Sequence, residues 1–109
     1  MEQAGLKISI GDKELKCFYI TEESAATPAI KRLCESPAKT HGCDTETGRK
    51  KGFENDPVAG LDPYRSFVSL LQFYDPATSV CYMFDTKRLP IKMFQPVFTA
   101  KRVICHNAL

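Results

Sequence analysis

The chain has 109 residues, of which 43% are hydrophobic, 10% aromatic and 26% charged. This ordinary globular composition excludes collagen-like, coiled-coil and wholly disordered proteins, and the length fits one small domain that buries about two-thirds of its unfolded surface. The net charge of +2 permits contact with a polyanion without requiring it, so any basic patch must be local.

The sequence also bears on the cellular compartment. No apolar stretch approaches the roughly 20 residues that span a bilayer, and the first residues lack the basic-then-apolar layout of a secretory signal. We therefore expect a soluble, cytoplasmic or otherwise intracellular protein with no membrane partner. The five cysteines are an odd number without a CxxC pair, which favours free thiols in a reducing compartment.

The first 38 residues predict a hairpin and a helix that lead into the rest of the fold. Apolar and polar residues alternate over 6–10 and over 15–20, on either side of Gly11-Asp12, which is typical of a β-hairpin. Thr27-Pro28 predicts an N-cap followed by proline in the first helical turn, and Pro37 marks the end of a short amphipathic helix.

The remaining residues, 39–109, predict three strands, a helix and a further strand. In chain order we expect a strand over 40–46, a polar loop inserted at 49–60, an antiparallel hairpin over 67–74 and 80–84, a helix over 91–98, and a strand over 102–105. This order predicts an α/β domain in which a mixed sheet with an antiparallel hairpin is flanked by helices.

Asp44-Thr45-Glu46 is the most informative segment for chemistry. At the end of a strand, two acids at a spacing of two project their carboxylates to the same side. Such paired oxygen donors suit Mg²⁺ or Mn²⁺, which retain water for phosphate oxygens. The alternative interpretation is a solvated acidic strand end without a ligand.

A series of ordered motifs points to a known family. They are Gly42-Cys43-Asp44-Thr45-Glu46-Thr47-Gly48, Gly60-Leu61-Asp62-Pro63, Leu70-Leu71-Gln72-Phe73, Met83-Phe84-Asp85 and Val103-Ile104-Cys105-His106-Asn107-Ala108. In this order they resemble the first and second motifs of the DEDD 3′-5′ exonucleases, especially the branch containing ribonuclease D and the proofreading domain of DNA polymerase I. The resemblance covers residues 39–109.

The resemblance implies a ribonuclease H-like fold whose first strand carries Asp44 and Glu46 as catalytic metal ligands. In this family, four acidic residues hold two Mg²⁺ or Mn²⁺ ions, which stabilise the entering and departing oxygens at the 3′ end of single-stranded DNA or RNA. The resemblance further assigns substrate contacts to four residues: Thr47, Leu61, His106 and Asn107. The assignment of Leu61 requires that residues 49–60 are an insertion within the first motif.

The acidic set is incomplete within these 109 residues. The second-motif aspartate is expected about four residues after Asn107, and the third motif, with a Tyr or His base and a last Asp, would follow it. We therefore expect a truncated exonuclease domain that is inactive as an isolated chain, while the parent protein is a 3′-5′ exonuclease. The alternative is a non-catalytic nucleic-acid-binding or protein-interaction module on the same scaffold.

Residues near the acidic motif offer further contacts. Arg49, Lys50 and Lys51 could bind phosphates of a single strand, with Phe53 or Tyr64 stacking on a base. The alternative is a solvated loop with a basic tip.

Other candidate ligands are interpreted as structural. Zinc is disfavoured because the spacing of the soft donors matches no paired signature; these donors are Cys34, His41, Cys43, Cys105 and His106. Asp62 and Asp85 are interpreted as turn and strand-end residues. The aromatic residues of the predicted elements are expected in the core: Phe67, Phe73, Tyr74, Tyr82, Phe84, Phe94 and Phe98.

Overall fold

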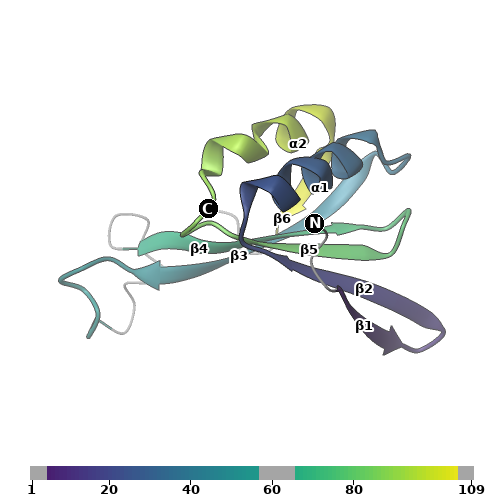
Figure 1. Cartoon of the computed structure of the whole chain (residues 1–109). Helices are drawn as coiled ribbons and strands as arrows, with labels where there is room; N and C mark the ends of the chain where they lie inside the picture. Colours follow the sequence, from purple (N-terminus) through teal and green to yellow (C-terminus); the bar gives the residue numbers. More distant parts are fainter. Residues whose placement is uncertain (1–4, 57–65, 106–109) are drawn as a thin grey trace.

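One mixed sheet and two helical segments make up the described part of the computed structural model, which comprises residues 5–56 and 66–105 (Figure 1). In chain order the elements are β1 (Gly5–Ile10), β2 (Lys13–Ile20), α1 (Glu23–Glu35), β3 (Thr40–Arg49), β4 (Ser66–Asp75), β5 (Val80–Asp85), the 3₁₀ helix η2 (Ile91–Phe94), α2 (Gln95–Ala100) and β6 (Arg102–Cys105). The α/β class and the predicted order after residue 39 are confirmed. Within these ranges, no helix has the length and apolar character needed to cross a bilayer.

The six described strands lie in the order β1-β2-β5-β4-β3-β6. Antiparallel pairs join β1 to β2, β3 to β4 and β4 to β5, whereas β2 runs parallel to β5 and β3 parallel to β6. The predicted N-terminal hairpin is confirmed, and Gly11 lies in its turn with a φ of 59°, a conformation that glycine adopts without a Cβ penalty. The sheet therefore includes the N-terminal hairpin, while the predicted boundary near residue 38 stays a prediction.

Helix α1 begins earlier than the sequence predicts. Thr27-Pro28 was expected at its start, but the helix begins at Glu23, and Pro28 lies inside it. Glu23 places a negative charge in the first turn, where the helix dipole favours it, and Ala25 and Ala26 have high helix propensity. The Thr27 hydroxyl donates to the carbonyl of Glu23 at 3.0 Å, so this side chain lies within the first turns and does not cap the helix.

Two other element boundaries differ from the predictions. The single helix expected over 91–98 is a 3₁₀ turn followed by α2, in which Pro96 occupies the first turn. Proline fits there because the first backbone N–H groups of a helix have no intrahelical partner. Strand β3 extends three residues beyond the predicted end at Glu46, so Arg49 belongs to the strand and not to the predicted loop.

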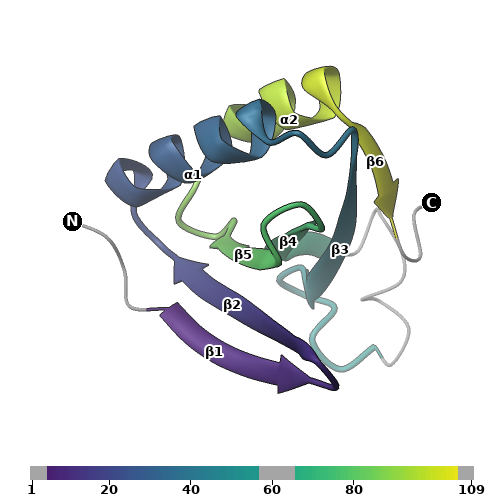
Figure 2. The ribbon, with the colours of Figure 1, turned by 90° about the vertical axis from the view of Figure 1, so that its right-hand side faces the viewer.

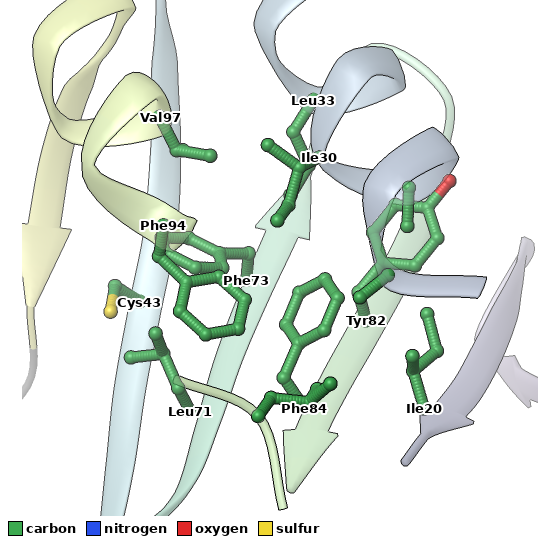
Figure 3. Packing of buried hydrophobic residues seen from close by; sticks show 13 residues of the cluster. Ile20, Ile30, Leu33, Cys43, Leu71, Phe73, Tyr82, Phe84, Phe94 and Val97 are labelled. Atoms are coloured by element: carbon green, nitrogen blue, oxygen red, sulfur yellow. The ribbon is translucent and has the colours of Figure 1, made fainter. Parts of the chain in front are cut away.

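Both helices cover the same face of the sheet, as Figure 2 shows. The core lies between them and the strands, where aromatic rings from β4, β5 and η2 pack closely: the Phe84 and Phe94 rings are tilted by 57° with centroids 4.7 Å apart (Figure 3). The predicted core positions of Phe73, Tyr82, Phe84 and Phe94 are confirmed, but Phe67 and Phe98 are exposed at 41% and 47%. The core residues are Ile20, Ala26, Ala29, Ile30, Leu33, Cys43, Leu71, Phe73, Tyr82, Phe84, Leu89, Phe94 and Val97.

His41 is a buried polar residue within this packing. Its Nε2 lies 3.0 Å from the carbonyl oxygen of Leu33, and because a carbonyl only accepts, Nε2 must carry the hydrogen. Leu33 belongs to the last turn of α1, whose carbonyls lack intrahelical donors, so the His41 N–H supplies the missing donor for the Leu33 carbonyl. His41 Nδ1 lies 3.8 Å from Asp75 Oδ1 and is the only buried side-chain N or O atom in the described ranges without a hydrogen-bond partner.

Candidate metal and nucleic-acid site

Strand β3 directs the two predicted metal ligands away from the helices. Along this strand His41 and Cys43 are buried on the helix-covered face, and successive strand residues point to opposite faces. Asp44 and Glu46 therefore share the other face of the sheet; Asp44 is half-buried and Glu46 is exposed. Because β3 lies between β4 and β6, the two carboxylates come from an interior strand of the described sheet.

Local contacts orient this acidic pair. Asp44 Oδ1 accepts the backbone N–H of Thr45 at 2.9 Å. Across the antiparallel pairing, Gln72 lies opposite Asp44, and Leu70 lies opposite Glu46. On the β4 side, therefore, an amide side chain lies opposite Asp44 and an aliphatic side chain lies opposite Glu46.

A β-bulge follows the acidic pair. The register of β3 and β4 shifts between Glu46 and Thr47, and the hydroxyl of Ser69 donates to the carbonyl of Glu46 at 3.1 Å. The carbonyl of Ser69 in turn accepts the backbone N–H of Thr86 at 3.2 Å. Bulges are frequent beside functional sites because they redirect side chains, and this one connects Glu46 to the segment after β5.

Gly48 lies two residues beyond Glu46 and is covered by an aromatic ring. A Cβ added to Gly48 would come within 2.6 Å of the Phe67 ring, closer than real Cβ contacts. Glycine therefore lets Phe67 lie directly against the end of β3. The same ring is 41% exposed and forms part of a neighbouring groove.

This groove combines apolar and cationic residues at the end of β5. It is lined by Phe67, Val68, Thr86, Lys87, Arg88, Leu89, Pro90 and Ile91. Ile91 is 55% exposed, so the apolar part of the lining is accessible. Arg88 Nη2 is 3.0 Å from the carboxylate of Glu22, which neutralises part of the positive charge of the groove.

The carboxylates of β3 are the type of ligand that a hard divalent cation prefers, but there are fewer of them than such a site needs. Asp44 and Glu46 supply carboxylate oxygens, the ligands that Mg²⁺ and Mn²⁺ prefer. Within residues 5–56 and 66–105, however, no group of three or more His, Cys, Asp or Glu side chains could hold a metal ion. The described residues thus provide two donors, fewer than the four acids that the family pattern requires.

The other predicted contacts are only partly described. Thr47 is exposed at the bulge, and Lys50 and Lys51 are exposed in the segment that extends beyond β3 (Figure 1). Phe53 is 39% exposed in the same segment. Five residues discussed in the sequence analysis lie outside the described residues: Leu61, Asp62, Tyr64, His106 and Asn107.

Asp85 has the structural role expected at a strand end. It is the last residue of β5, and its Oδ1 accepts the backbone N–H of Lys87 at 3.0 Å. The hydroxyl of Tyr19 donates to Asp85 Oδ2 at 3.2 Å. Desolvation and this hydrogen bond raise the pKa of Tyr19 above its usual value of 10.0. No sequence signal predicts this contact, because the two residues are 66 positions apart.

Comparisons with known proteins complete the description of the site. No family model matches the sequence, and no curated protein matches it. Among solved structures, Trypanosoma brucei RNase D in complex with RNA U12 matches with a TM-score of 0.58 and 15% identity, over 82% of this chain and 29% of that one. A second structure of Trypanosoma brucei RNase D matches with a TM-score of 0.50 and 17% identity, over 72% of this chain and 23% of that one.

Because the sequence identities are only 15% and 17%, these matches show a shared fold and nothing more. The chain spans less than a third of the length of the RNase D that it matches. The chain therefore has an α/β, ribonuclease H-like fold that resembles part of RNase D.

Proposed function

We propose that this chain is the N-terminal portion of a metal-dependent 3′-5′ exonuclease domain that acts on single-stranded RNA or DNA. The observation that carries this proposal is the position of Asp44 and Glu46 in a sheet that resembles RNase D. Both acids lie on an interior strand, and by strand alternation they point away from the face that holds His41 and Cys43. Figure 2 shows that α1 and α2 cover a single face of the sheet. A phosphodiester could therefore approach them without displacing a described helix.

In this proposal, Asp44 and Glu46 hold a divalent cation. When bound, such a cation supplies positive charge that stabilises the anionic oxygens of a phosphodiester under attack. The N–H of Thr45 holds one oxygen of Asp44, while exposed Glu46 is free to reorient towards the cation. Because the described residues supply only these two donors, we propose that the 109-residue chain binds the cation weakly and does not hydrolyse nucleic acid by itself.

The basic segment, Arg49-Lys50-Lys51, is proposed to bind phosphates some distance from this acidic pair. Lys50 lies six residues beyond Asp44 in a nearly continuous strand, which places it roughly 20 Å away along the strand direction. Lys50 and Lys51 would therefore contact phosphates remote from the 3′ end. The groove at the end of β5 offers the exposed ring of Phe67 as a stacking surface for a base.

The two-donor set also supports a second candidate, a non-catalytic nucleic-acid-binding module. A binding module requires the basic segment and the groove but does not require cation binding by Asp44 and Glu46. The two candidates therefore differ in whether Mn²⁺ binds at β3.

The metal site can be tested with Mn²⁺ as the probe. We expect Asp44→Asn and Glu46→Gln each to weaken Mn²⁺ binding by about tenfold or more, the effect of losing one contact to a charged group. Glu35→Gln is the matched control, because Glu35 is exposed on α1, on the other face of the sheet. Equal Mn²⁺ affinity in all three variants, measured by calorimetry, would remove β3 from the proposed site and leave the binding module.

Nucleic-acid contact can be tested with a twelve-nucleotide oligouridylate and its DNA counterpart. In Lys50→Ala/Lys51→Ala we expect weaker binding and a salt dependence of log K that is shallower by about 1.4, because each single-strand phosphate contact contributes about 0.7. Lys31→Ala/Lys92→Ala is the control, since both lysines are exposed on the helical layer. An unchanged slope in the first variant would refute contact through the basic segment.

A further inference from the structure

Four of the five cysteines form two directly opposed pairs in the sheet. Cys17 is the register partner of Cys81 between β2 and β5, and Cys43 is the partner of Cys105 between β3 and β6. Both pairs join parallel strands. All four are free thiols in the structure.

The positions of Cys43 and Cys105 are compatible with a disulfide. Neighbouring strands lie about 4.8 Å apart, within the Cα separation of about 4.4–6.8 Å that disulfides require. Residues at the same register in adjacent parallel strands point to the same face of the sheet, so the two thiols project side by side.

Exposure distinguishes this pair from the other one. Cys105 is exposed, so a dissolved reagent can reach its sulfur, whereas Cys43 is 7% exposed. In the second pair Cys17 is 8% exposed, and Cys81 is half-buried on a neighbouring interior strand. The first pair thus has an accessible thiol beside a protected one, while the second has no exposed thiol.

We propose that Cys43 and Cys105 form a site of reversible oxidation that reacts with small disulfides of the glutathione type. The Cys105 thiolate attacks one sulfur of the small disulfide, which forms a mixed disulfide and releases one small thiolate. The sulfur of Cys43 then attacks Sγ of Cys105, which forms the protein disulfide and releases the second small thiolate. The two protons of the protein thiols pass to the released thiolates, so one disulfide is reduced as another forms.

The bond would connect the strand that carries Asp44 to the edge strand of the sheet. Cys43 immediately precedes Asp44, and β6 has β3 as its one neighbouring strand in the described sheet. The disulfide would close a loop of about 60 residues, which constrains the unfolded chain strongly. We therefore expect oxidation to raise the melting temperature by on the order of 10 °C.

The test treats the whole chain with oxidised glutathione, alkylates the remaining thiols and maps peptides without reduction. We expect a Cys43–Cys105 crosslink and alkylated Cys17, Cys34 and Cys81. A stable glutathione adduct on Cys105, a Cys105-linked dimer or earlier crosslinking of Cys17 to Cys81 would each overturn the proposal.

Variants separate the two exchange steps. Cys43→Ala should stop the reaction at the Cys105 mixed disulfide, and Cys105→Ser, a change at an exposed position, should leave Cys43 unmodified. Cys81→Ala should still form the crosslink with the same increase in melting temperature. Modification of Cys43 in the Cys105→Ser variant would show that access does not pass through Cys105 and would refute the mechanism.

Discussion

The contacts of His41 predict a large stability loss for His41→Leu. The substitution leaves the buried carbonyl of Leu33 without its side-chain donor, which costs about 1–3 kcal/mol. It also leaves the Asp75 carboxylate, only 3% exposed, without the imidazole 3.8 Å away. Removing one partner of a buried ionic pair costs about 3–5 kcal/mol, and we expect the total for His41→Leu, including the lost donor to Leu33, to lie in this range.

This loss can be measured by thermal and urea denaturation. For a chain of this length, about 3–5 kcal/mol corresponds to a fall in melting temperature of roughly 12–20 °C. Thr45→Ala provides the control on the same strand, because Thr45 is exposed and its loss should change stability by less than about 0.5 kcal/mol.

A double-mutant cycle isolates the contribution of the carboxylate charge. Asp75→Asn keeps the side-chain oxygen that accepts the backbone N–H of Ala77 at 2.9 Å, so the turn after β4 remains capped. In the Asp75→Asn background, His41→Leu should cost only the unsatisfied carbonyl of Leu33, about 1–3 kcal/mol. Additive effects of the two substitutions would refute an interaction between His41 and Asp75, whatever the size of each single effect.

Two further predictions concern the sheet. Gly48→Ala should displace the Phe67 ring and lower the free energy of unfolding, measured by urea denaturation, by about 1 kcal/mol. Gly42→Ala, where the nearest contact of the new Cβ would be 3.6 Å, should be nearly neutral. Equal effects of the two substitutions would contradict the ring contact. Burial raises the thiol pKa from 9.0 to about 11 in Cys81 and about 12 in Cys43. The stability that the neutral thiols contribute below pH 9 should therefore be lost as the pH rises through these values. A urea midpoint that is unchanged between about pH 8 and about pH 10.5 would oppose this prediction.

Local signals in the sequence predict most of the elements correctly. Alternating residues around Gly11 specify the first hairpin, and the spacing of Asp44 and Glu46 places both on one face of β3. The predicted start of α1 is wrong because Pro28 is typical of a first helical turn, whereas here it lies inside a helix that begins with residues of high helix propensity. Strand β3 continues past its predicted end because Thr47, Gly48 and Arg49 pair with residues 66–68 of β4, a contact between distant segments.

The contacts that complete the site depend on tertiary structure. His41 was considered only as a disfavoured zinc ligand, and its bond to the last turn of α1 requires knowledge of where β3 passes that helix. Likewise, the connection from Glu46 through Ser69 to Thr86 depends on a bulge in the register of β3 and β4. The acidic pair is predictable from the spacing of its residues, but the surrounding bonds are not.

The parallel pairing of β2 with β5 has a consequence for folding during synthesis. The N-terminal hairpin is translated first, yet the strand beside which β2 lies comes about 60 residues later. Until β5 is available, one edge of β2 has unpaired backbone groups that can pair with another chain. Closing so long a loop also slows folding. The first hairpin to be synthesised is therefore among the last elements to join the sheet.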